Sequence, residues 1–256
     1  MIPRRVYEHV KNHNWFAVAI DFAIVVIGVF VGLQAQEWSR NFNDRQRETQ
    51  IVEGLIGDLD IDRAQYAQSL DTAEERIIAA IASLKGARLP PLDFEAGDRS
   101  AGTVDYAFDV SKLAAAPAAR RDRLWTDIVI GFHPTPSTMT YDAIAGAGDI
   151  TLIRDPELAK EIQGYYNLVS SVGEQNEKIL TLRRDALNAG AVYGLAPFAP
   201  KQAEDFFRLI ADNPPLAATI RIMATFVIYH HGEVAAADAR AAALQARLKE
   251  YLGTVK

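Results

Sequence analysis

Few residues in this sequence have types and spacing that could carry chemistry, and His230-His231-Gly232-Glu233 is the most suggestive group. Adjacent histidines on a helix point about 100° apart, so they cannot share a metal ion as two histidines four residues apart can. His230 and Glu233 can lie on one face, which supplies at most two ligands. We therefore predict a polar group on a helix surface, with no metal ion and no cofactor bound.

Other catalytic and nucleotide-binding patterns are missing from the sequence. Gly146-Ala147-Gly148 is followed by no phosphate-loop lysine and fits the end of a helix better. There is no GxSxG motif, and the lack of cysteine excludes disulfides, thiolate metal sites and cysteine nucleophiles. Tyr141, Tyr165 and Tyr166 could line a pocket, but aromatic residues at helical spacing are usually core. The sequence predicts no catalytic residues and a protein that is not an enzyme.

Asp21 is the one ionisable residue in an otherwise apolar stretch, WFAVAIDFAIVVIGVFVGLQA, which runs from Trp15 to Ala35. Lipid solvates charge poorly, so such a group usually faces a helix bundle or a wet cavity. Three interpretations stay open. Asp21 lies shallow and within reach of water, or it forms a polar contact in an oligomer, or it relays protons or ions.

This apolar stretch predicts the first helix of the chain, which carries Asp21. About 20 apolar residues in a helix span the hydrocarbon core of a bilayer, and tryptophan favours the membrane–water boundary. The sequence therefore predicts a short tail over 1–14 and a transmembrane helix over 15–36, with Trp15 and Trp38 at its boundaries. No small-x-small cleavage site follows, so we expect a retained anchor and not a signal peptide.

Small residues form one face of this predicted membrane helix. Ala17, Asp21, Gly28, Gly32 and Ala35 fall within an arc of about 60° when each residue advances by 100°. Gly28 and Gly32 make a GxxxG pair, which lets a second helix approach closely. Chance alignment is the alternative, because glycine is common in membrane helices. The face predicts an interface with a second copy or with another membrane protein.

The distribution of charge bears on partners and location. A net charge of −6 argues against a nucleic-acid surface, which needs clustered Lys and Arg. Three basic residues precede the span and three follow it closely, so their count does not decide its orientation. The short leading tail favours a cytoplasmic N-terminus and a periplasmic body at a bacterial inner membrane, with the lipid bilayer as a partner.

The rest of the chain predicts an all-α protein in which a helical bundle follows the span. Over 37–86 we expect a long juxtamembrane helix that can continue the span and that Gly86 ends. Its apolar residues recur every three or four positions, with Asp62 in one of the apolar slots. Charged residues, Arg76 among them, fill the opposite face. Gly54 and Gly57 weaken this helix and predict a bend.

Two further regions complete the predicted body. Residues 87–119 lack helical periodicity and predict an irregular insertion, with a brief helix beginning near Ser111. Residues 120–256 predict a helical body that packs on the juxtamembrane helix. Helix starts are expected after Ser137, at Asp155-Pro156 and at Asn213-Pro214, because these residues suit the N-cap and the first turn.

Two segments resemble an uncharacterised bacterial family of single-pass membrane proteins. In the first, over 20–48, an acid precedes Val25-Val26-Ile27-Gly28, and then Leu33-Gln34 and Trp38 lead into a charged helix. The second, TYDAIAGAGDITLIRDPELAKEIQGYY over 140–166, is similar to a Tyr–small–Gly–Leu-Ile–acid–Leu–Tyr-Tyr segment of that family. Asp21 stands where glutamate is usual. The resemblance implies an anchor followed by a helical body, and it implies no activity.

These observations together favour a membrane-anchored protein that self-associates or binds a partner through its span and juxtamembrane helix. Two alternatives stay open. The chain could be an accessory subunit of an ion-driven membrane complex that uses Asp21 as the titrating group. It could also be a sensor whose extracytoplasmic domain binds a small ligand.

Overall fold

A computed structural model describes residues 15–92, 108–109, 113 and 115–255 of this chain. These residues form helices, with no β-strand among them, so the all-α prediction is confirmed. The chain divides into two compact units, residues 1–50 and 51–256. The predicted irregular insertion over 87–119 lies mostly outside the described residues, and so does the helix start near Ser111.

Helix α2 (Trp15–Gly86) is a single helix of 72 residues that contributes to both units. It ends at Gly86, as the sequence predicts. Helix α2 runs through Gly54 and Gly57 without interruption, and the bend expected there stays a prediction. A Cβ atom on Gly54 would lie 3.1 Å from Thr140 Cγ2, so this glycine permits close approach of another segment.

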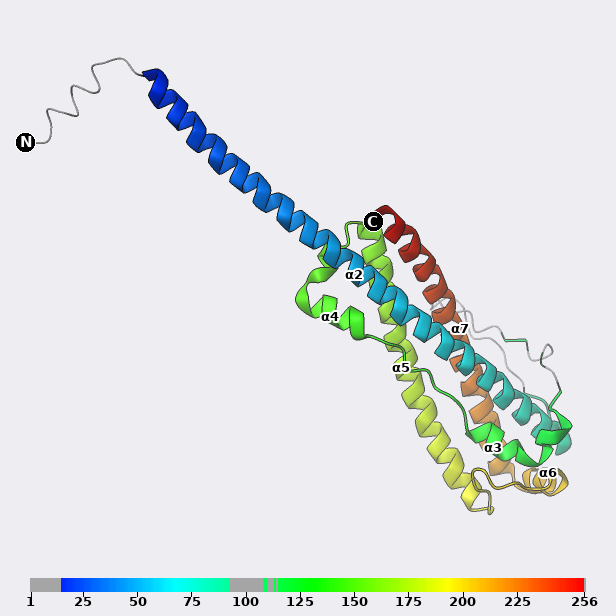
Figure 1. The fold of residues 1–256 in the computed structure, drawn as a ribbon. Helices are drawn as coiled ribbons and strands as arrows, with labels where there is room; N and C mark the ends of the chain where they lie inside the picture. Colours follow the sequence, from blue (N-terminus) through cyan, green and yellow to red (C-terminus); the bar gives the residue numbers. More distant parts are fainter. Residues whose placement is uncertain (1–14, 93–107, 110–112, 114, 256) are drawn as a thin grey trace, which may run out of the picture. The chain divides into compact units, whose positions relative to one another are not determined.

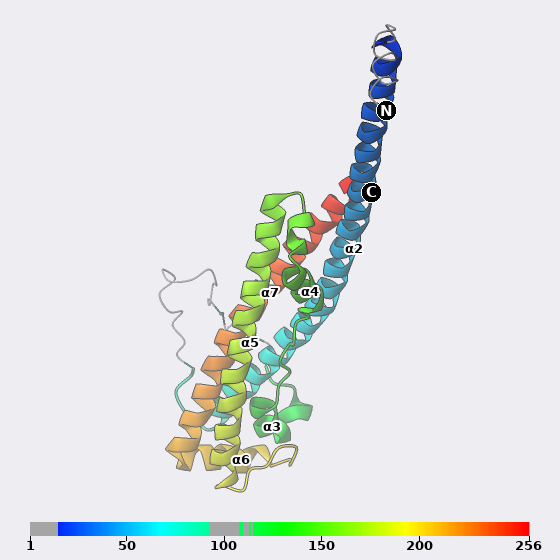
Figure 2. The ribbon, with the colours of Figure 1, turned by 90° about the vertical axis from the view of Figure 1, so that its left-hand side faces the viewer.

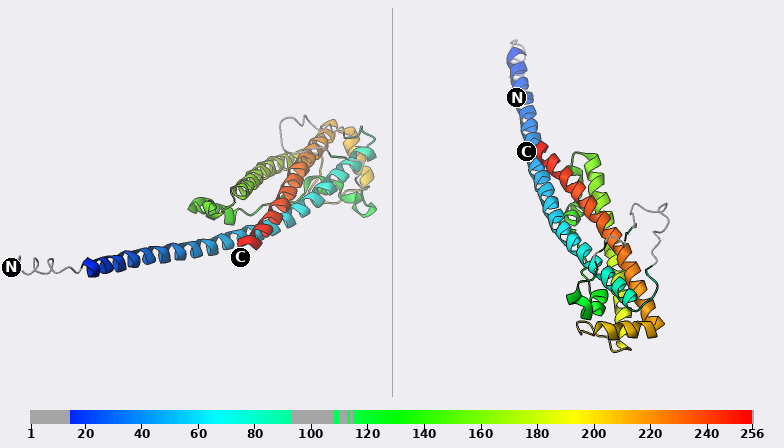
Figure 3. Two further views of the ribbon diagram at one scale, coloured as in Figure 1. Left: turned by 90° about the horizontal axis from the view of Figure 1, so that it is seen from above. Right: turned by 90° about the vertical axis from the view of Figure 1, so that its right-hand side faces the viewer.

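Three long helices build the second unit: residues 51–86 of α2, α5 (Pro156–Ala191) and α7 (Pro214–Val255). The views in Figures 1 and 2 agree that α5 and α7 lie side by side and run in opposite directions. Figure 3 shows the second half of α2 beside α7. This arrangement is a helical bundle, in which each long helix buries its apolar stripe against the other two.

Shorter helices complete the second unit. They are η3 (Ala118–Arg123), α3 (Leu124–Val129), α4 (Met139–Ala147), η4 (Asp149–Leu152) and α6 (Ala203–Asp212). Figure 2 shows α6 lying across the end of the bundle where α5 ends and α7 begins. The predicted helical body over 120–256 thus begins with the end of a 3-10 turn and one short α-helix.

The starts of α5 and α4 were predicted with different precision. The Asp155 side chain accepts hydrogen bonds from the backbone N–H groups of Glu157 and Leu158 at 3.0 and 3.2 Å, which confirms the predicted cap. Helix α4 begins one residue later than expected, with Thr138 and not Ser137 at the N-cap position and no cap bond from the Thr138 side chain. The Ser137 hydroxyl donates to Asp58 Oδ1 at 2.9 Å and accepts a long hydrogen bond from the backbone N–H of Met139 at 3.5 Å.

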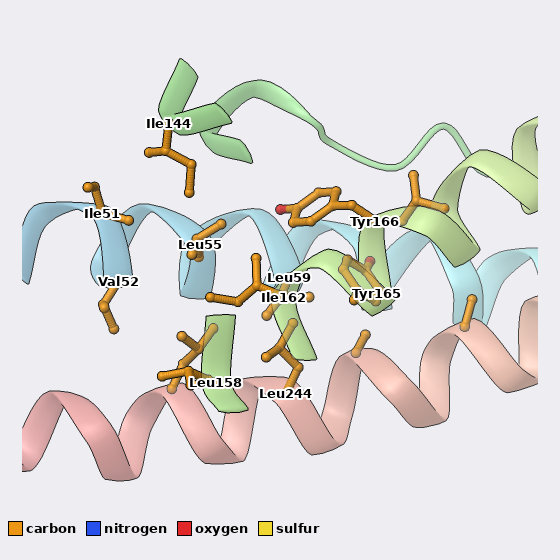
Figure 4. Close-up of a cluster of buried hydrophobic side chains, with 14 of the residues drawn as sticks. Ile51, Val52, Leu55, Leu59, Ile144, Leu158, Ile162, Tyr165, Tyr166 and Leu244 are labelled. Atoms are coloured by element: carbon orange, nitrogen blue, oxygen red, sulfur yellow. The ribbon is translucent and has the colours of Figure 1, made fainter. Parts of the chain in front are cut away.

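The bundle has an apolar cluster toward each end. In the first, shown in Figure 4, side chains of α2, α4, α5 and α7 meet, including Leu55, Ile144, Leu158 and Leu244. The second cluster joins the end of α2 to α3, α6, the last part of α5 and the beginning of α7. Burial of a large apolar side chain contributes about 1.5–3 kcal/mol, so these two clusters hold the bundle together.

Polar side chains lie between the two clusters, and we call them the polar belt: Ser69, Arg76, His133, Asn176 and His230. Along each long helix their positions fall between the residues of the first cluster and those of the second. A small apolar group around Ile77 and Val227 shares this level of the bundle. A buried polar group costs free energy unless it is hydrogen-bonded, so the partners of each belt residue need to be identified.

Candidate functional site

The apolar part of α2 is exposed along its length. Every residue from Ala19 to Arg47 is exposed, and the exposed fraction reaches 70% at Phe22 and 63% at Val25. One stretch of 18 residues has a mean hydropathy of 1.9, and none of these residues is buried. Within the described residues, α2 is the one helix that is long and apolar enough to cross a membrane.

The predicted membrane-helix face lies within this exposed segment. A Cβ atom added to Gly28 or Gly32 would meet nothing within 4 Å, and Asp21 and Ala35 are exposed. Ala17 belongs to the same helix, but its side chain lies outside the described ones. Because α2 is continuous, helical geometry brings all five residues to one side.

The two predicted boundary residues are also on α2. Trp38 is 77% exposed, as expected of a ring that meets a lipid headgroup region. Trp15 begins α2, and its side chain lies outside the described ones. The division between a span over 15–36 and a juxtamembrane helix over 37–86 stays a prediction, since α2 continues through it without a break.

The histidine group of α7 is buried, which corrects the prediction of a helix-surface group. His230 is 2% exposed and Glu233 is 5% exposed. The prediction failed for His230 and Glu233 because α7 turns the face that carries them toward the bundle, whereas the His231 side chain is 18% exposed. Among the residues that the structure describes, no group of three or more His, Cys, Asp and Glu is placed to hold a metal ion.

His230 is connected to the segment that follows α3. Its Nε2 lies 2.8 Å from Asn176 Oδ1, while Asn176 Nδ2 donates to the carbonyl of Pro134 at 2.7 Å. The His133 ring meets the His230 ring edge to face, with centroids 5.7 Å apart. Both ring nitrogens of His133 are buried and have no hydrogen-bond partner in the described part of the chain.

Burial and neighbouring positive charge keep these imidazoles neutral. Burial, with the Arg76 and Arg183 charges added, lowers the pKa of His133 to about 4. Burial also lowers the pKa of His230 to about 3, and His133 and Arg76 lower it further. At neutral pH the charge at this level of the bundle therefore comes from arginine and not from histidine.

Arg76 is the least expected member of the belt, because the sequence pattern places it on the charged face of its helix. Its side chain is 3% exposed, and its Nε donates to the carbonyl of Ile128 at 3.1 Å. Its Nη2 has no hydrogen-bond partner among the described residues. The spacing from Ala73 and Ala80, three residues before and four after, is the signal that could have placed Arg76 inside.

Arg76 borders a cavity of about 320 Å³ in the second unit. The cavity wall comes from α2, η3, α3 and the segment after α3, with Phe198 from the loop before α6. Its charged residues are Glu75, Arg76, Arg120, Arg123 and Asp127. The sequence analysis identified none of these as site residues, because they come together only when three segments meet.

A second polar network lies in the first apolar cluster, around Asp62 in its predicted core position. Tyr165 OH donates to Asp62 Oδ2 at 2.6 Å, and the backbone N–H of Ser137 donates to Asp62 Oδ1 at 2.6 Å. The Tyr66 hydroxyl lies 3.1 Å from that of Tyr165. Burial raises the pKa of Asp62, while its hydrogen bonds with Tyr165 and Ser137 lower it.

Two adjacent tyrosines allow a matched test of this network. We expect Tyr165→Phe to lower the free energy of unfolding by about 1–3 kcal/mol, because Asp62 loses a buried donor. Tyr166→Phe is the control, since the Tyr166 hydroxyl is buried without a hydrogen-bond partner among the described residues. Urea denaturation followed by helical circular dichroism measures both. Equal losses in the two variants would contradict the assignment.

No protein-family model, curated protein or solved structure matches this chain. The function is therefore argued from the geometry described above.

Proposed function

We propose that this chain is a single-pass, membrane-anchored helical protein without catalytic activity, which associates through its span with a second copy or another membrane protein. The observation that carries the proposal is the exposure of the apolar side chains of α2. Ten large apolar residues between Ile20 and Leu33 are more than 40% exposed. A water-soluble surface rarely carries so large a contiguous apolar patch.

A lipid bilayer is the environment that suits this apolar surface best. Burying each large apolar side chain is worth about 1.5–3 kcal/mol, so ten of them favour insertion by more than about 10 kcal/mol. The helix also satisfies its own backbone hydrogen bonds, as a lipid-exposed segment requires. The resemblance of 20–48 and 140–166 to a family of single-pass proteins supports an anchor followed by a helical body. For the orientation we propose a cytoplasmic N-terminus and a periplasmic body.

Membrane anchoring is tested with the full chain and with a variant that lacks residues 1–36. We expect the full chain to stay in the membrane fraction after alkaline carbonate washing, and the shortened chain to be released. The mature N-terminus is sequenced in parallel. A full chain that is soluble without detergent, or whose mature N-terminus lies beyond Gln34, would overturn the proposal.

Association through the small-residue face is tested separately. Gly28→Leu places a large side chain on this face, so we expect the apparent dissociation constant in detergent to rise at least tenfold. Val26→Leu adds one methylene on the opposite side of the helix, about 150° away, and is expected to leave association unchanged. Crosslinking and native mass spectrometry measure both. The proposed association would be contradicted by a wild-type chain that is strictly monomeric and to which no membrane-protein partner crosslinks in native membranes.

A further inference from the structure

Arg76 is a buried cation that forms no ion pair in the described part of the chain. Isolating a charged group from water costs several kcal/mol unless an opposite charge or hydrogen bonds compensate. Burial and the nearby Arg183 lower the pKa of Arg76 to about 10, so the guanidinium is still charged at neutral pH. Its Nε donates to the neutral carbonyl of Ile128, and its Nη2 has no hydrogen-bond partner among the described residues.

The carboxylates that border the same cavity are already engaged. Arg120 donates to both oxygens of Asp127, at 2.9 and 3.0 Å, and its Nη1 lies 2.5 Å from Glu75 Oε1. Arg120 thus binds both carboxylate oxygens of Asp127 and one carboxylate oxygen of Glu75. Neither carboxylate forms an ion pair with Arg76 in the described structure, so the guanidinium is available for an added anion.

The backbone around Arg76 is shaped to hold its guanidinium in place. A Cβ atom on Gly131 would lie 2.7 Å from Arg76 Nη1 and 2.8 Å from Arg76 Cδ, so only glycine allows this packing. Together with the hydrogen bond from Nε to Ile128, this contact fixes the plane of the side chain. A preorganised guanidinium is the group that binds carboxylates best.

The rest of the cavity wall narrows the class of anion. Ile130, Phe132 and Phe198 supply apolar surface, while Arg123 adds a second cation. The Phe198 backbone N–H donates to Thr126 Oγ1 at 3.2 Å, which holds this loop over the cavity. The cavity wall carries three arginines and two carboxylates, so one added negative charge balances it and a second would stay uncompensated.

From these contacts we propose that the cavity binds a small organic monocarboxylate, whose carboxylate pairs with Arg76 and Arg123 and whose apolar part lies against Ile130, Phe132 and Phe198. The volume of about 320 Å³ is at the small end of the range for ligand pockets, about 300–1,000 Å³, and suits a molecule of this size. This binding does not depend on membrane association.

Calorimetric titration of the full chain in a non-ionic detergent tests the site. The probes are benzoate and hexanoate, with methyl benzoate as the neutral analogue, inorganic phosphate as the multivalent anion, and protein-free detergent as the blank. We expect benzoate or hexanoate to bind with a dissociation constant below about 1 mM, and methyl benzoate at least tenfold more weakly. Phosphate that binds more tightly than both carboxylates would overturn the proposed ligand class.

Variants assign the binding to this cavity. We expect Arg76→Gln to weaken benzoate binding at least tenfold, and Arg123→Gln and Phe198→Ala to weaken it about threefold. The last two residues are exposed, so these variants keep the proposal testable if Arg76→Gln fails to fold. Arg121→Gln is the control, since Arg121 pairs with Glu204 outside the cavity. Binding that all three variants leave unchanged, or no binding by the wild type at about 10 mM, would refute the proposal.

Discussion

Replacing Gly190 with alanine is expected to lower the free energy of unfolding of the second unit by about 1–3 kcal/mol, the usual cost of overpacking a core. A Cβ atom on Gly190 would overlap the indole ring of Trp125, and Trp125 is only 3% exposed. The ring cannot move away easily, because Phe206 packs against it edge to face with centroids 6.4 Å apart. The close approach of α3 to α5 therefore requires glycine at this position.

The matched control is Gly173→Ala, which lies on the same helix. A Cβ atom on Gly173 would meet nothing within 4 Å. Alanine favours helix over glycine by about 1 kcal/mol, so this variant is expected to be neutral or more stable than the wild type. Urea denaturation of the full chain in detergent, followed by circular dichroism at the helical band, compares the two. Two variants of equal stability would show that α3 and α5 do not meet closely at Gly190.

Acidification from pH 7 to pH 5 is expected to destabilise the second unit by about 2 kcal/mol for each of His133 and His230. Their folded-state pKa values, about 4 and about 3, lie below the 6.5 of an unfolded histidine. As pH falls below 6.5, the unfolded chain therefore binds protons that the folded chain does not. The contribution of the two histidines to the free energy of unfolding is therefore constant well above pH 6.5 and is lost progressively as the pH falls toward 4.

Burial sets the direction of the effect on both pKa values, and the charged groups around the rings add to it. Arg76 on α2 and Arg183 on α5 repel a proton on His133, and Arg76 and His231 repel one on His230. The raised pKa of Asp62 acts in the opposite sense, because the folded carboxyl takes up a proton before an unfolded one does. Its contribution is common to the wild type and the histidine variants, so it cancels in the comparison.

The acid effect is measured as the pH dependence of the melting temperature in wild type and in His133→Gln, His230→Gln and the double variant. We expect the double variant to lose most of the decrease between pH 7 and pH 5. His231→Gln is the control and is expected to change the profile less, because Glu74 Oε1, 3.9 Å from His231 Nε2, opposes the effect of burial on its pKa. A wild-type melting temperature that is flat over this range would contradict the neutral, buried state of the two rings.

Local sequence signals predicted the helices well because they are properties of neighbouring residues. The Asp155-Pro156 start of α5 needs only a side-chain acceptor and a proline that lacks an N–H. The apolar stripe of α2 placed Asp62 in the core through its three- and four-residue spacing alone, and Asp62 has 0% exposure. The end of α2 at Gly86 follows from the same kind of signal.

Contacts with a distant partner could not be predicted. The sequence assigns Gly54 to a bend of its helix but does not show that this glycine lies against Thr140, where it permits close packing. Ser137 has the residue type of an N-cap, and its hydroxyl also donates to Asp58 on another helix. In both cases the partner comes from another segment, and one-dimensional spacing contains no information about that segment.

The sequence by itself determined the all-helical class, the long apolar helix near the N-terminus and the starts of α5 and α7, since periodicity and capping act over one or two helical turns. Only the tertiary structure decided that Arg76, His133 and His230 share the interior of the bundle and that a cavity borders Arg76. The alanine-rich middle of α7 has no strongly apolar face, so its buried side is set by the helices that pack against it. The spacing within one helix can indicate that a polar residue is buried, as it does for Asp62, but which groups surround that residue depends on the other segments that meet there.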